Sequence, residues 1–386
     1  MKKILVFSLA YGPRFWGGAE LAVKEITDRI PAERVSFDLI TLRFDSALLR
    51  EEMMGNVRVH RIGFVTANPN IKDLSAFPLV LNKYLFPLLA FFKAAMLHRK
   101  RRYDGTWAIM ANYAGFAALF FKLMHPEVPY ILTLQEGDPI SYIKHRVRFV
   151  YPLFRRVFTK ADVVQAISRY LADFGRAMGA RAPIHVIPNG VNLSIFRSSK
   201  AKRFPGLNES PKILITTSRL VEKNAVEDTI EALLFLPPDV RLVVLGIGPL
   251  EKALKGKVRA LGLDKRVFFL GHKSHEEIAV YFDEAHMFVR PSLSEGMGSS
   301  FIEAFAAGLP VVATPVGGIP DFLRHEETGL FCEVKNPESI ARAVARLFAD
   351  TMLRERIIMN AGKLARTRYD WNMIAREFEE KIFCTL

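Results

Sequence analysis

Cysteine is scarce in this sequence of 386 residues, and what it cannot build is informative. The two cysteines, Cys332 and Cys384, stand far apart in the chain. One such pair offers neither a disulfide framework nor a cysteine metal site, and low cysteine content is typical of proteins from a reducing compartment. We therefore expect a cytoplasmic protein whose fold depends on hydrophobic packing.

Several motifs for metals and nucleotides are also missing. The sequence has no Walker A segment and no Asp-x-Asp pair, and His275-Glu-Glu-Ile278 does not complete a His-Glu-x-x-His zinc motif. Nothing in the sequence therefore points to a bound metal or to any other cofactor.

Long hydrophobic runs are absent as well. The longest, Leu85 to Leu97, is interrupted by Lys93 and is shorter than the ~20 residues that cross a bilayer. The apolar start, Ile4 to Leu9, is too short for a signal peptide and is followed at once by Gly12-Pro13, which favours a first β-strand ending in a turn. We expect a soluble protein, attached at most to a membrane surface.

Positive charge is unevenly distributed. The net charge is +14, and residues 1–193 hold 27 Lys and Arg against 15 Asp and Glu, so nearly all of the excess lies in the first half. The basic residues alternate with long apolar side chains and form no recognisable recognition helix or RNA-binding motif. We therefore do not expect a nucleic-acid partner.

Two segments concentrate this charge beside apolar residues. Residues 86–102 run from an apolar stretch into His98-Arg-Lys-Arg-Arg102, and residues 142–160 mix six Lys and Arg with large apolar or aromatic side chains. Basic amphipathic segments bind anionic headgroups, which predicts a peripheral position on the inner face of the cell membrane. In the alternative interpretation the apolar positions face the protein's own core and the basic ones are simply solvated.

The order of segments predicts two α/β domains. Apolar runs typical of buried strands alternate with helix-like segments in both halves, and Ala19, Val23, Ile26 and Ile30 mark one face of a first helix that stops at Pro31. Such alternation implies parallel sheets, whose ligand sites lie beyond the carboxyl ends of the strands. The polar, Pro- and Gly-containing residues 197–211 are expected to link two Rossmann-like domains that face each other across a cleft. The strands are expected at residues 4–9, 37–42, 57–62, 105–111, 130–134, 163–166 and 185–187, then at 212–217, 241–245, 267–270, 287–290 and 311–313.

A glycine-rich loop in the second half is the most informative feature. It follows an expected strand that ends at Arg290 and leads into a helix from about Phe301 to Ala307, with Gly308 as the residue just past its end. Helix N-termini suit phosphate groups, which here would meet Gly296, Met297, Gly298, Ser299 and Ser300.

Two carboxylates flank this helix start. Glu295 is expected in the loop and Glu303 in the first turn of the helix. One could accept sugar hydroxyls and the other those of a ribose. Two plainer interpretations stay open. Ser300 and Glu303 also fit a capping box, and Glu295 could be a solvated loop acid.

A pair of cations follows the first expected strand of the second half. Arg219 and Lys223 are placed to neutralise a diphosphate, a role that gains weight because no Asp-x-Asp is present to hold a metal there. A surface pair that includes Glu222 is the simpler alternative. Gly17-Gly18 and Gly246-Ile-Gly248 are weaker phosphate-binding candidates, since ordinary tight turns also use such glycines.

Together these segments resemble the retaining glycosyltransferases of family 4, which have the two-Rossmann-domain architecture called GT-B. The resemblance runs over nearly the whole chain, and the order and spacing of the motifs make it specific. It rests on Gly17–Glu20, Ala166-Ile-Ser168, Val186–Asn192, Ser218–Asn224, Leu245–Pro249, Ser294–Ala304 and Gly308–Asp321.

The resemblance implies a role for each of these positions. Arg219 and Lys223 would bind the donor diphosphate, and Glu303 would bind the ribose. Glu295 and the backbone of residues 296–300 would hold the sugar and the phosphates. It also implies a UDP- or GDP-sugar donor, retention of anomeric configuration without a metal, and a leaving diphosphate that acts as the base. The final segment resembles a terminal helix that crosses back, so the domains are expected at 1–196 with 368–386 and at 197–367.

One departure from the family concerns the acceptor side. Relatives commonly carry a His in a Thr-x-His-Gly-x-Asp setting, where this chain has Gln135 and Glu136 followed by Asp138. A Gln can bind a sugar hydroxyl but cannot exchange a proton near pH 7. This departure argues against a proton-shuttle role here and motivates the alternative of a non-catalytic donor-binding subunit of a glycosyltransferase pair. The motifs and the resemblance as a whole favour a hexosyltransferase acting on a glycan or lipid-linked acceptor.

Overall fold

A computed structural model describes residues 1–12, 17–69, 73–196 and 211–386, which form two compact units. Unit 1 consists of Met1–Glu136, Ile140–Asn189 and Trp371–Leu386, and unit 2 of Gly137–Pro139 and Gly190–Asp370. The units divide after Asn189 and after Asp370, where the sequence suggested 196 and 367. Most of the expected linker, residues 197–210, lies outside the described residues. Both units are α/β domains built on parallel sheets, as predicted.

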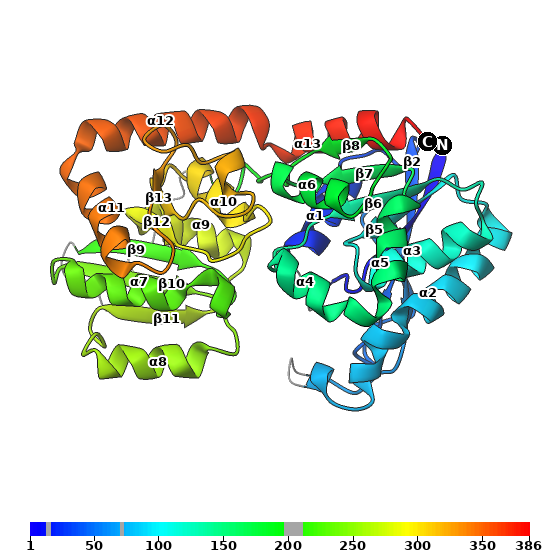
Figure 1. Ribbon diagram of the computed structural model, residues 1–386, viewed down its shortest axis with the longest axis horizontal. Coiled ribbons are helices and arrows are strands. Elements are labelled where there is room, and N and C mark those ends of the chain that lie inside the picture. The colour runs from blue at the N-terminus through cyan, green and yellow to red at the C-terminus, as the bar shows by residue number, and fades with distance from the viewer. Residues whose placement is uncertain (13–16, 70–72, 197–210) are drawn as a thin grey trace. The chain divides into compact units, whose positions relative to one another are not determined.

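The described part of unit 1 contains an eight-stranded sheet in the order β3-β4-β2-β1-β5-β6-β7-β8 (Figure 1). All neighbours are parallel except β3 and β4. The edge strand β3 was not predicted, because its Glu-Glu-Met-Met sequence is half exposed and has no buried apolar run. The strands are β1 (Lys2–Phe7), β2 (Val35–Leu42), β3 (Glu51–Met54), β4 (Val57–Ile62), β5 (Gly105–Ile109), β6 (Tyr130–Leu134), β7 (Val163–Ala166) and β8 (Ile184–Val186).

Helices cover both faces of this sheet. Alternate residues of β1 point to opposite faces, so Ile4 and Val6 pack with α1 whereas Phe7 meets Phe121 of α3. The helices of the first two segments of unit 1 are α1 (Gly18–Thr27), η1 (Asp73–Ser75), α2 (Leu79–Arg101), α3 (Tyr113–Met124), α4 (Ile140–Arg146), η2 (Arg148–Val150), α5 (Tyr151–Thr159) and α6 (Arg169–Ala177).

The chain returns to unit 1 at its end, which confirms the expected terminal helix. Helix α13 (Trp371–Phe378) and the π-helical turn η6 (Glu379–Phe383) pack beside α1, and the Trp371 and Phe378 side chains are buried in the same core as Val6. The Nζ of Lys2 donates to the carbonyl oxygen of Phe383 at 2.9 Å, so the two termini lie side by side (Figure 1).

Unit 2 contains a parallel sheet in the order β11-β10-β9-β12-β13-β14. Its strands are β9 (Lys212–Thr217), β10 (Val240–Leu245), β11 (Val267–Gly271), β12 (Met287–Arg290), β13 (Val311–Ala313) and β14 (Leu330–Phe331). The two-residue β14 was not predicted. The helices are η3 (Glu222–Asn224), α7 (Val226–Ala232), η4 (Leu233–Phe235), α8 (Glu251–Ala260), α9 (His275–Glu284), α10 (Ser299–Ala306), η5 (Ile319–Asp321), α11 (Pro337–Ala349) and α12 (Thr351–Arg368).

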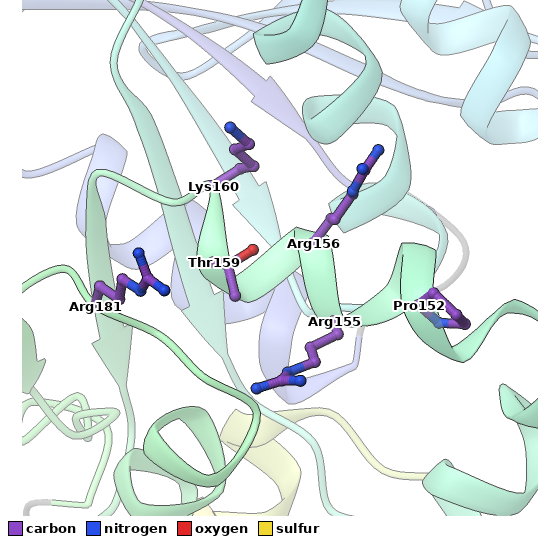
Figure 2. Close-up of a pocket in the computed structure, with 6 residues that line it drawn as sticks. All are labelled: Pro152, Arg155, Arg156, Thr159, Lys160 and Arg181. Atoms are coloured by element: carbon purple, nitrogen blue, oxygen red, sulfur yellow. The ribbon is translucent and has the colours of Figure 1, made fainter.

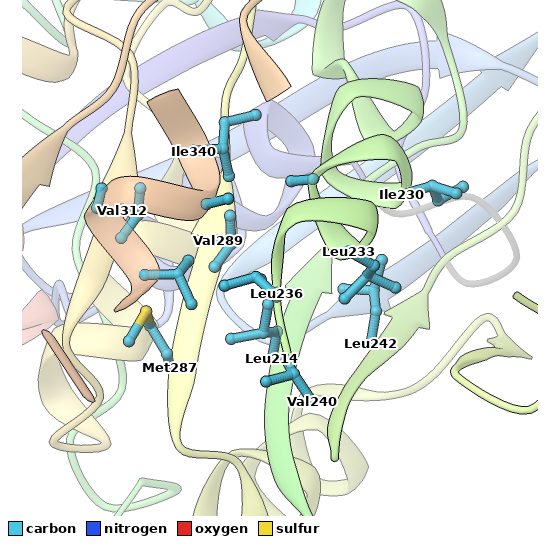
Figure 3. Packing of buried hydrophobic residues seen from close by; sticks show 14 of the residues in the cluster. Leu214, Ile230, Leu233, Leu236, Val240, Leu242, Met287, Val289, Val312 and Ile340 are labelled. Carbon is cyan, nitrogen blue, oxygen red and sulfur yellow. The ribbon is translucent and has the colours of Figure 1, made fainter. Parts of the chain in front are cut away.

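The two faces of this second sheet pack differently. One carries an aliphatic core in which Leu214 and Val289 of the strands meet Ile230 of α7 and Ile340 of α11 (Figure 3). The other carries linked aromatic rings, with Phe288 of β12 packing edge-on against Phe301 of α10 at 5.4 Å between ring centroids. The aromatic face therefore fixes α10, and with it the glycine-rich loop, against the sheet.

Helix α2 is the one helix among the described residues that is long and apolar enough to span a membrane by length and composition alone. From the sequence, the apolar run that Lys93 interrupts is expected to be too short to cross a bilayer, but the helix extends beyond that run on both sides. Phe86, Ala90 and Ala94 nevertheless pack inside unit 1, where α2 contacts α3 and β2. The helix is thus part of the domain's own packing, with one exposed side.

Candidate active site

The glycine-rich loop ends at Gly298, which is the N-cap of α10. Gly298 has φ +84°, and a Cβ there would lie 2.7 Å from the Phe301 ring, so only glycine fits this close turn. Helix α10 consequently begins at Ser299, with Gly308 just past its end, close to the prediction. Its first N–H groups have no carbonyl acceptor within the helix, which makes this end of α10 suitable for an anion.

Arg290, at the end of β12, organises the loop and was missed by the sequence analysis. Its guanidinium is buried and forms an ion pair with Glu295, donates to Ser300 Oγ at 2.7 Å, and lies 4.6 Å from the centre of the Phe301 ring. Burial lowers the pKa of Arg290 to about 10, which still leaves it protonated at neutral pH. An arginine at the carboxyl end of a buried strand was the signal that could have revealed it.

Glu295 is therefore not a solvated loop acid. Its Oε1 accepts from the Gly296 N–H at 3.1 Å, while its other oxygen is held by Arg290. Its backbone is enclosed by Gly317-Gly318, because a Cβ at Gly317 would lie 1.8 Å from the Glu295 carbonyl oxygen, to which the Gly318 N–H donates. The loop thus holds one carboxylate in a fixed orientation. The buried side chain of Met297 belongs to the same loop.

Lys223 lies beside Glu295. The carbonyl of Lys223 accepts from the Leu293 N–H at 2.7 Å, and a Cβ at Gly137 would lie 2.7 Å from Lys223 Nζ and 3.5 Å from Glu295 Oε1. The short segment Gly137–Pro139 thus reaches the space between an ammonium and a carboxylate. The Lys223 ammonium also pairs with Asp138 at 3.3 Å.

These contacts have opposite effects on the charge of Lys223. Burial lowers the pKa of the Lys223 ammonium, and the neighbouring Asp138 carboxylate raises it again. From the sequence, Asp138 is expected on the acceptor side together with Gln135 and Glu136. The structure places Asp138 with Lys223 in unit 2 and the other two in unit 1, and the acceptor-side role of Asp138 stays a prediction.

Arg219 lies in the loop after β9, and its side chain is exposed. Its carbonyl accepts from Asn224 Nδ2 at 2.7 Å, which ties the segment from Arg219 to Lys223 into one turn. Gly246 and Gly248 pack against the backbone of this loop, since a Cβ at Gly246 would lie 1.9 Å from the Ser218 carbonyl oxygen. The close approach of the two backbones is enough to explain why glycine occupies both positions, and no phosphate contact is needed for that explanation.

Glu303 is the fifth residue of α10 rather than a residue of its first turn. The capping-box interpretation is wrong, because the N-cap is Gly298 and Glu303 contacts another partner. Its Oε1 lies 3.3 Å from Nδ1 of His275, the first residue of α9, and the carboxylate is buried. His275 belongs to no zinc motif, and no sequence pattern reveals its contact with Glu303, because that contact depends on how α9 and α10 pack together.

The remaining candidates lie in unit 1. Gly17 is the N-cap of α1, and its N–H donates to Glu20 Oε2 at 2.9 Å, which fits a simple helix start; Gly18 is open to added atoms. Gln135 Oε1 accepts from Asn189 Nδ2 at 3.2 Å. Glu136 Oε1 accepts from the Ala111 N–H at 2.7 Å, so the polar residues after β6 bind the loops that follow β5 and β8.

One group of side chains among the described residues has donor atoms close enough to suggest a metal site. His98, His125 and Glu127 in unit 1 place these atoms within 4.8 Å of one another. However, Nδ1 of His98 accepts from the Tyr103 N–H at 3.1 Å. The neutral ring therefore carries its proton on Nε2, which leaves no lone pair for a metal. The two imidazoles instead pack against Phe121, His98 edge-on at 5.4 Å and His125 tilted at 4.7 Å between ring centroids.

Two family models match this chain. One, described as glycosyl transferase 4-like domain, covers residues 17–190, and the other, glycosyl transferases group 1, covers residues 198–364. The chain belongs to the GT-B glycosyltransferases of the family 4 type. The alternative of a non-catalytic donor-binding subunit is not favoured by these matches.

Solved structures agree in fold. The chain aligns over its full length with all of sucrose-phosphate synthase from Thermosynechococcus elongatus, with a TM-score of 0.85 at 21% identity. Anabaena HepE, solved in complex with UDP-glucose, aligns over the same full extent with a TM-score of 0.75 at 22% identity.

A curated relative is more similar in sequence but over a shorter stretch. The GDP-mannose-dependent alpha-(1-6)-phosphatidylinositol monomannoside mannosyltransferase of Mycobacterium tuberculosis is 30% identical over 251 residues. The match covers 59% of this chain and 63% of that protein.

Proposed function

We propose that this glycosyltransferase moves a hexose from a UDP- or GDP-sugar to a glycan or lipid-linked acceptor of the cell envelope, with retention of anomeric configuration and without a metal. The observation that carries the proposal is the meeting of Lys223, Glu295 and the N-terminus of α10 in unit 2, with Arg290 holding the carboxylate. The UDP-glucose bound to HepE and the GDP-mannose used by the mycobacterial relative support a nucleotide-sugar donor.

Each group has a chemical task in this proposal. The Arg219 and Lys223 side chains and the N–H groups of Ser299 and Ser300 stabilise the charge that grows on the diphosphate as the sugar leaves. Glu295, fixed by Arg290, accepts sugar hydroxyls. Glu303 accepts the ribose hydroxyls, with His275 beside it.

The acceptor is deprotonated by the departing diphosphate itself, so the mechanism needs no pair of opposed carboxylates. Lys223 binds Asp138 at 3.3 Å, and donor phosphate competes with this carboxylate for the ammonium. Gln135 and Glu136, held in place after β6, are proposed to contact the acceptor.

Substitution of the two cations tests the donor site. Arg219→Ala and Lys223→Ala should each lower kcat/KM by about 100-fold or more, since one preorganised donor of this kind contributes roughly 2.7–4 kcal/mol. Lys252→Ala, an exposed lysine of α8, is the matched control and should leave kcat/KM unchanged. A double Arg219→Ala/Lys223→Ala variant with near-normal turnover would refute the assignment.

Turnover should also survive excess EDTA. An enzyme that loses its turnover with EDTA and recovers it only with Mg²⁺ or Mn²⁺ would contradict metal independence.

We also propose that unit 1 docks on an anionic cytoplasmic membrane surface. Both basic segments have a buried side, formed by residues such as Phe86 and Phe154, but each also exposes large apolar groups. Phe149 is 84% exposed with the Arg148 guanidinium 4.3 Å from its ring centre, and Phe92 of α2 is 64% exposed. Apolar side chains next to cations suit the headgroup region of anionic lipids, where each nearby Lys or Arg adds ~1 kcal/mol.

Vesicle binding tests this docking. Co-sedimentation with phosphatidylglycerol vesicles should rise with anionic lipid and fall with salt, and Phe149→Ser with Val150→Ser should weaken it about tenfold. Met352→Ser is the matched control, because Met352 is equally exposed on α12 of unit 2. If the wild-type protein ignores anionic vesicles at low salt, a soluble acceptor becomes the better proposal.

A further inference from the structure

A cavity of about 380 Å³ on unit 1 is lined by six residues, of which four are basic. Pro152, Arg155, Arg156 and Thr159 recur at helical spacing, so α5 presents one face to the cavity. Arg181, from the loop between α6 and β8, lies opposite, and Figure 2 shows Arg155 and Arg181 extending toward one another. The full lining is Pro152, Arg155, Arg156, Thr159, Lys160 and Arg181, and we call it the cationic pocket.

The charge of the cationic pocket is not balanced by its surroundings. Residues 140–189 contain nine Lys and Arg but only two acids, Asp162 and Asp173. Asp162 pairs with Lys122 at 2.8 Å and Asp173 with Arg176 at 2.6 Å, so both acids are engaged with cations outside the pocket. Four like charges around one cavity repel one another, and a bound anion would relieve that repulsion.

The position of the cationic pocket separates it from the proposed transfer site. Thr159 and Lys160 lie at the end of α5 just before β7 begins at Val163, and Arg181 lies just before β8 begins at Ile184. These residues therefore sit toward the amino ends of the strands. Gln135 follows the carboxyl end of β6, at the opposite edge of the same sheet. A ligand in the cationic pocket is thus neither the donor nor the reacting group of the acceptor.

We propose that the cationic pocket binds a phosphate group that carries about two negative charges. Arginine forks match phosphate oxygens in paired hydrogen bonds. The same chemistry is offered by the phosphomonoester headgroup of a membrane lipid and by a soluble anion such as pyrophosphate. The inference rests on unit 1 alone and does not depend on the donor chemistry proposed for unit 2.

Two variants with equal loss of charge provide the test. Arg155→Gln/Arg181→Gln removes the facing arginines of the pocket, and Lys144→Gln/Arg148→Gln removes two exposed cations of the same segment outside it. Both pairs are made in an Arg219→Ala/Lys223→Ala background, so that pyrophosphate has no proposed donor site to occupy. Thermal unfolding verifies that each variant folds, and Lys160→Gln is a third, milder pocket variant.

Two probes distinguish the source of the phosphate. Pyrophosphate binding is measured by calorimetry, and vesicle binding is compared between phosphatidic acid and phosphatidylglycerol at equal surface charge. We expect the pocket pair to weaken pyrophosphate binding at least tenfold, which indicates a soluble anion, or to abolish a preference for phosphatidic acid, which indicates a lipid. The control pair should lower binding to both kinds of vesicle equally. The proposal is overturned if the wild-type pocket in this background binds neither probe, or if the pocket and control pairs behave alike.

Discussion

The two units use buried charge differently although both are parallel-sheet domains. Unit 2 places Arg290, Glu295 and Lys223 at or after the carboxyl ends of its strands, beside the start of α10. Unit 1 buries a charged network in the middle of a strand. Asp38 of β2 contacts His60 Nε2 at 2.8 Å and forms an ion pair with Arg101 of α2.

This contrast shows that a buried ion pair has no single meaning. In unit 2 the partners of Glu295 leave one carboxylate oriented beside a helix N-terminus. In unit 1 Asp38 is held by His60 of β4 and Arg101 of α2, so the network fastens α2 to the sheet. We therefore expect substitutions among the partners of Glu295 to abolish activity and substitutions among the partners of Asp38 to reduce stability.

The largest effect is expected for Arg290→Ala. Removing one partner of a buried ion pair costs about 3–5 kcal/mol, and here it also releases Glu295 and Ser300. We predict less than 1% of wild-type kcat/KM together with a lower denaturation midpoint. Arg290→Lys keeps the charge without the fork and should retain more stability than activity. An active Arg290→Ala enzyme would show that the orientation of Glu295 is unimportant.

The next effect sharpens the contrast in unit 1. Asp38→Ala should lower the free energy of unfolding by about 3 kcal/mol in urea titrations, while kcat per folded molecule stays within twofold. His60 and Arg101 hold the pKa of the Asp38 carboxyl below its usual range. The contribution of Asp38 to the free energy of unfolding is therefore complete above the ordinary pKa of a carboxyl group. It is lost as the pH falls through the lowered pKa of Asp38.

Asp38→Asn provides the pH control. The variant should lose stability near neutral pH and show a weaker dependence of unfolding free energy on acidification than the wild type. If both proteins lose stability in parallel below pH 5, the acid sensitivity comes from other carboxylates.

A smaller effect tests the pairing of Lys223 with Asp138. Donor binding needs the ammonium, and because burial lowers the Lys223 pKa, kcat/KM should fall as the pH rises through that lowered value. Asp138→Asn removes the carboxylate that raises the pKa, so the alkaline fall should move to lower pH and activity at high pH should drop several-fold. An unchanged pH profile would mean that Asp138 does not act through Lys223.

The smallest effect concerns the glycine pair of unit 1. A Cβ at Gly18 meets no atom within 4 Å, and this residue begins α1. Gly18→Ala should therefore stabilise the protein by about 0.4–1 kcal/mol in thermal unfolding and leave kcat/KM unchanged if Gly18 only forms a turn. A stable variant with a raised donor KM would instead show that the glycine admits a phosphate.

The sequence by itself determined the alternation of strands and helices, because buried parallel strands are continuous apolar runs and β12 or β6 can be read without their neighbours. It also determined the order of the motifs and the glycine-rich start of α10. The edge strand β3 could not be predicted in this way, because its half-exposed sequence has no apolar run and the strand is defined by its backbone pairing with β4.

Only the tertiary structure decided which charged groups meet. Glu303 faces His275 from another helix, Glu295 is held by an arginine at the end of a strand, and Asp138 lies with Lys223. The cationic pocket likewise joins α5 to a loop beyond α6. Local sequence fixes backbone preference within a few residues, whereas these contacts join residues from separate elements. Their distances depend on how helices and loops pack on a shared sheet.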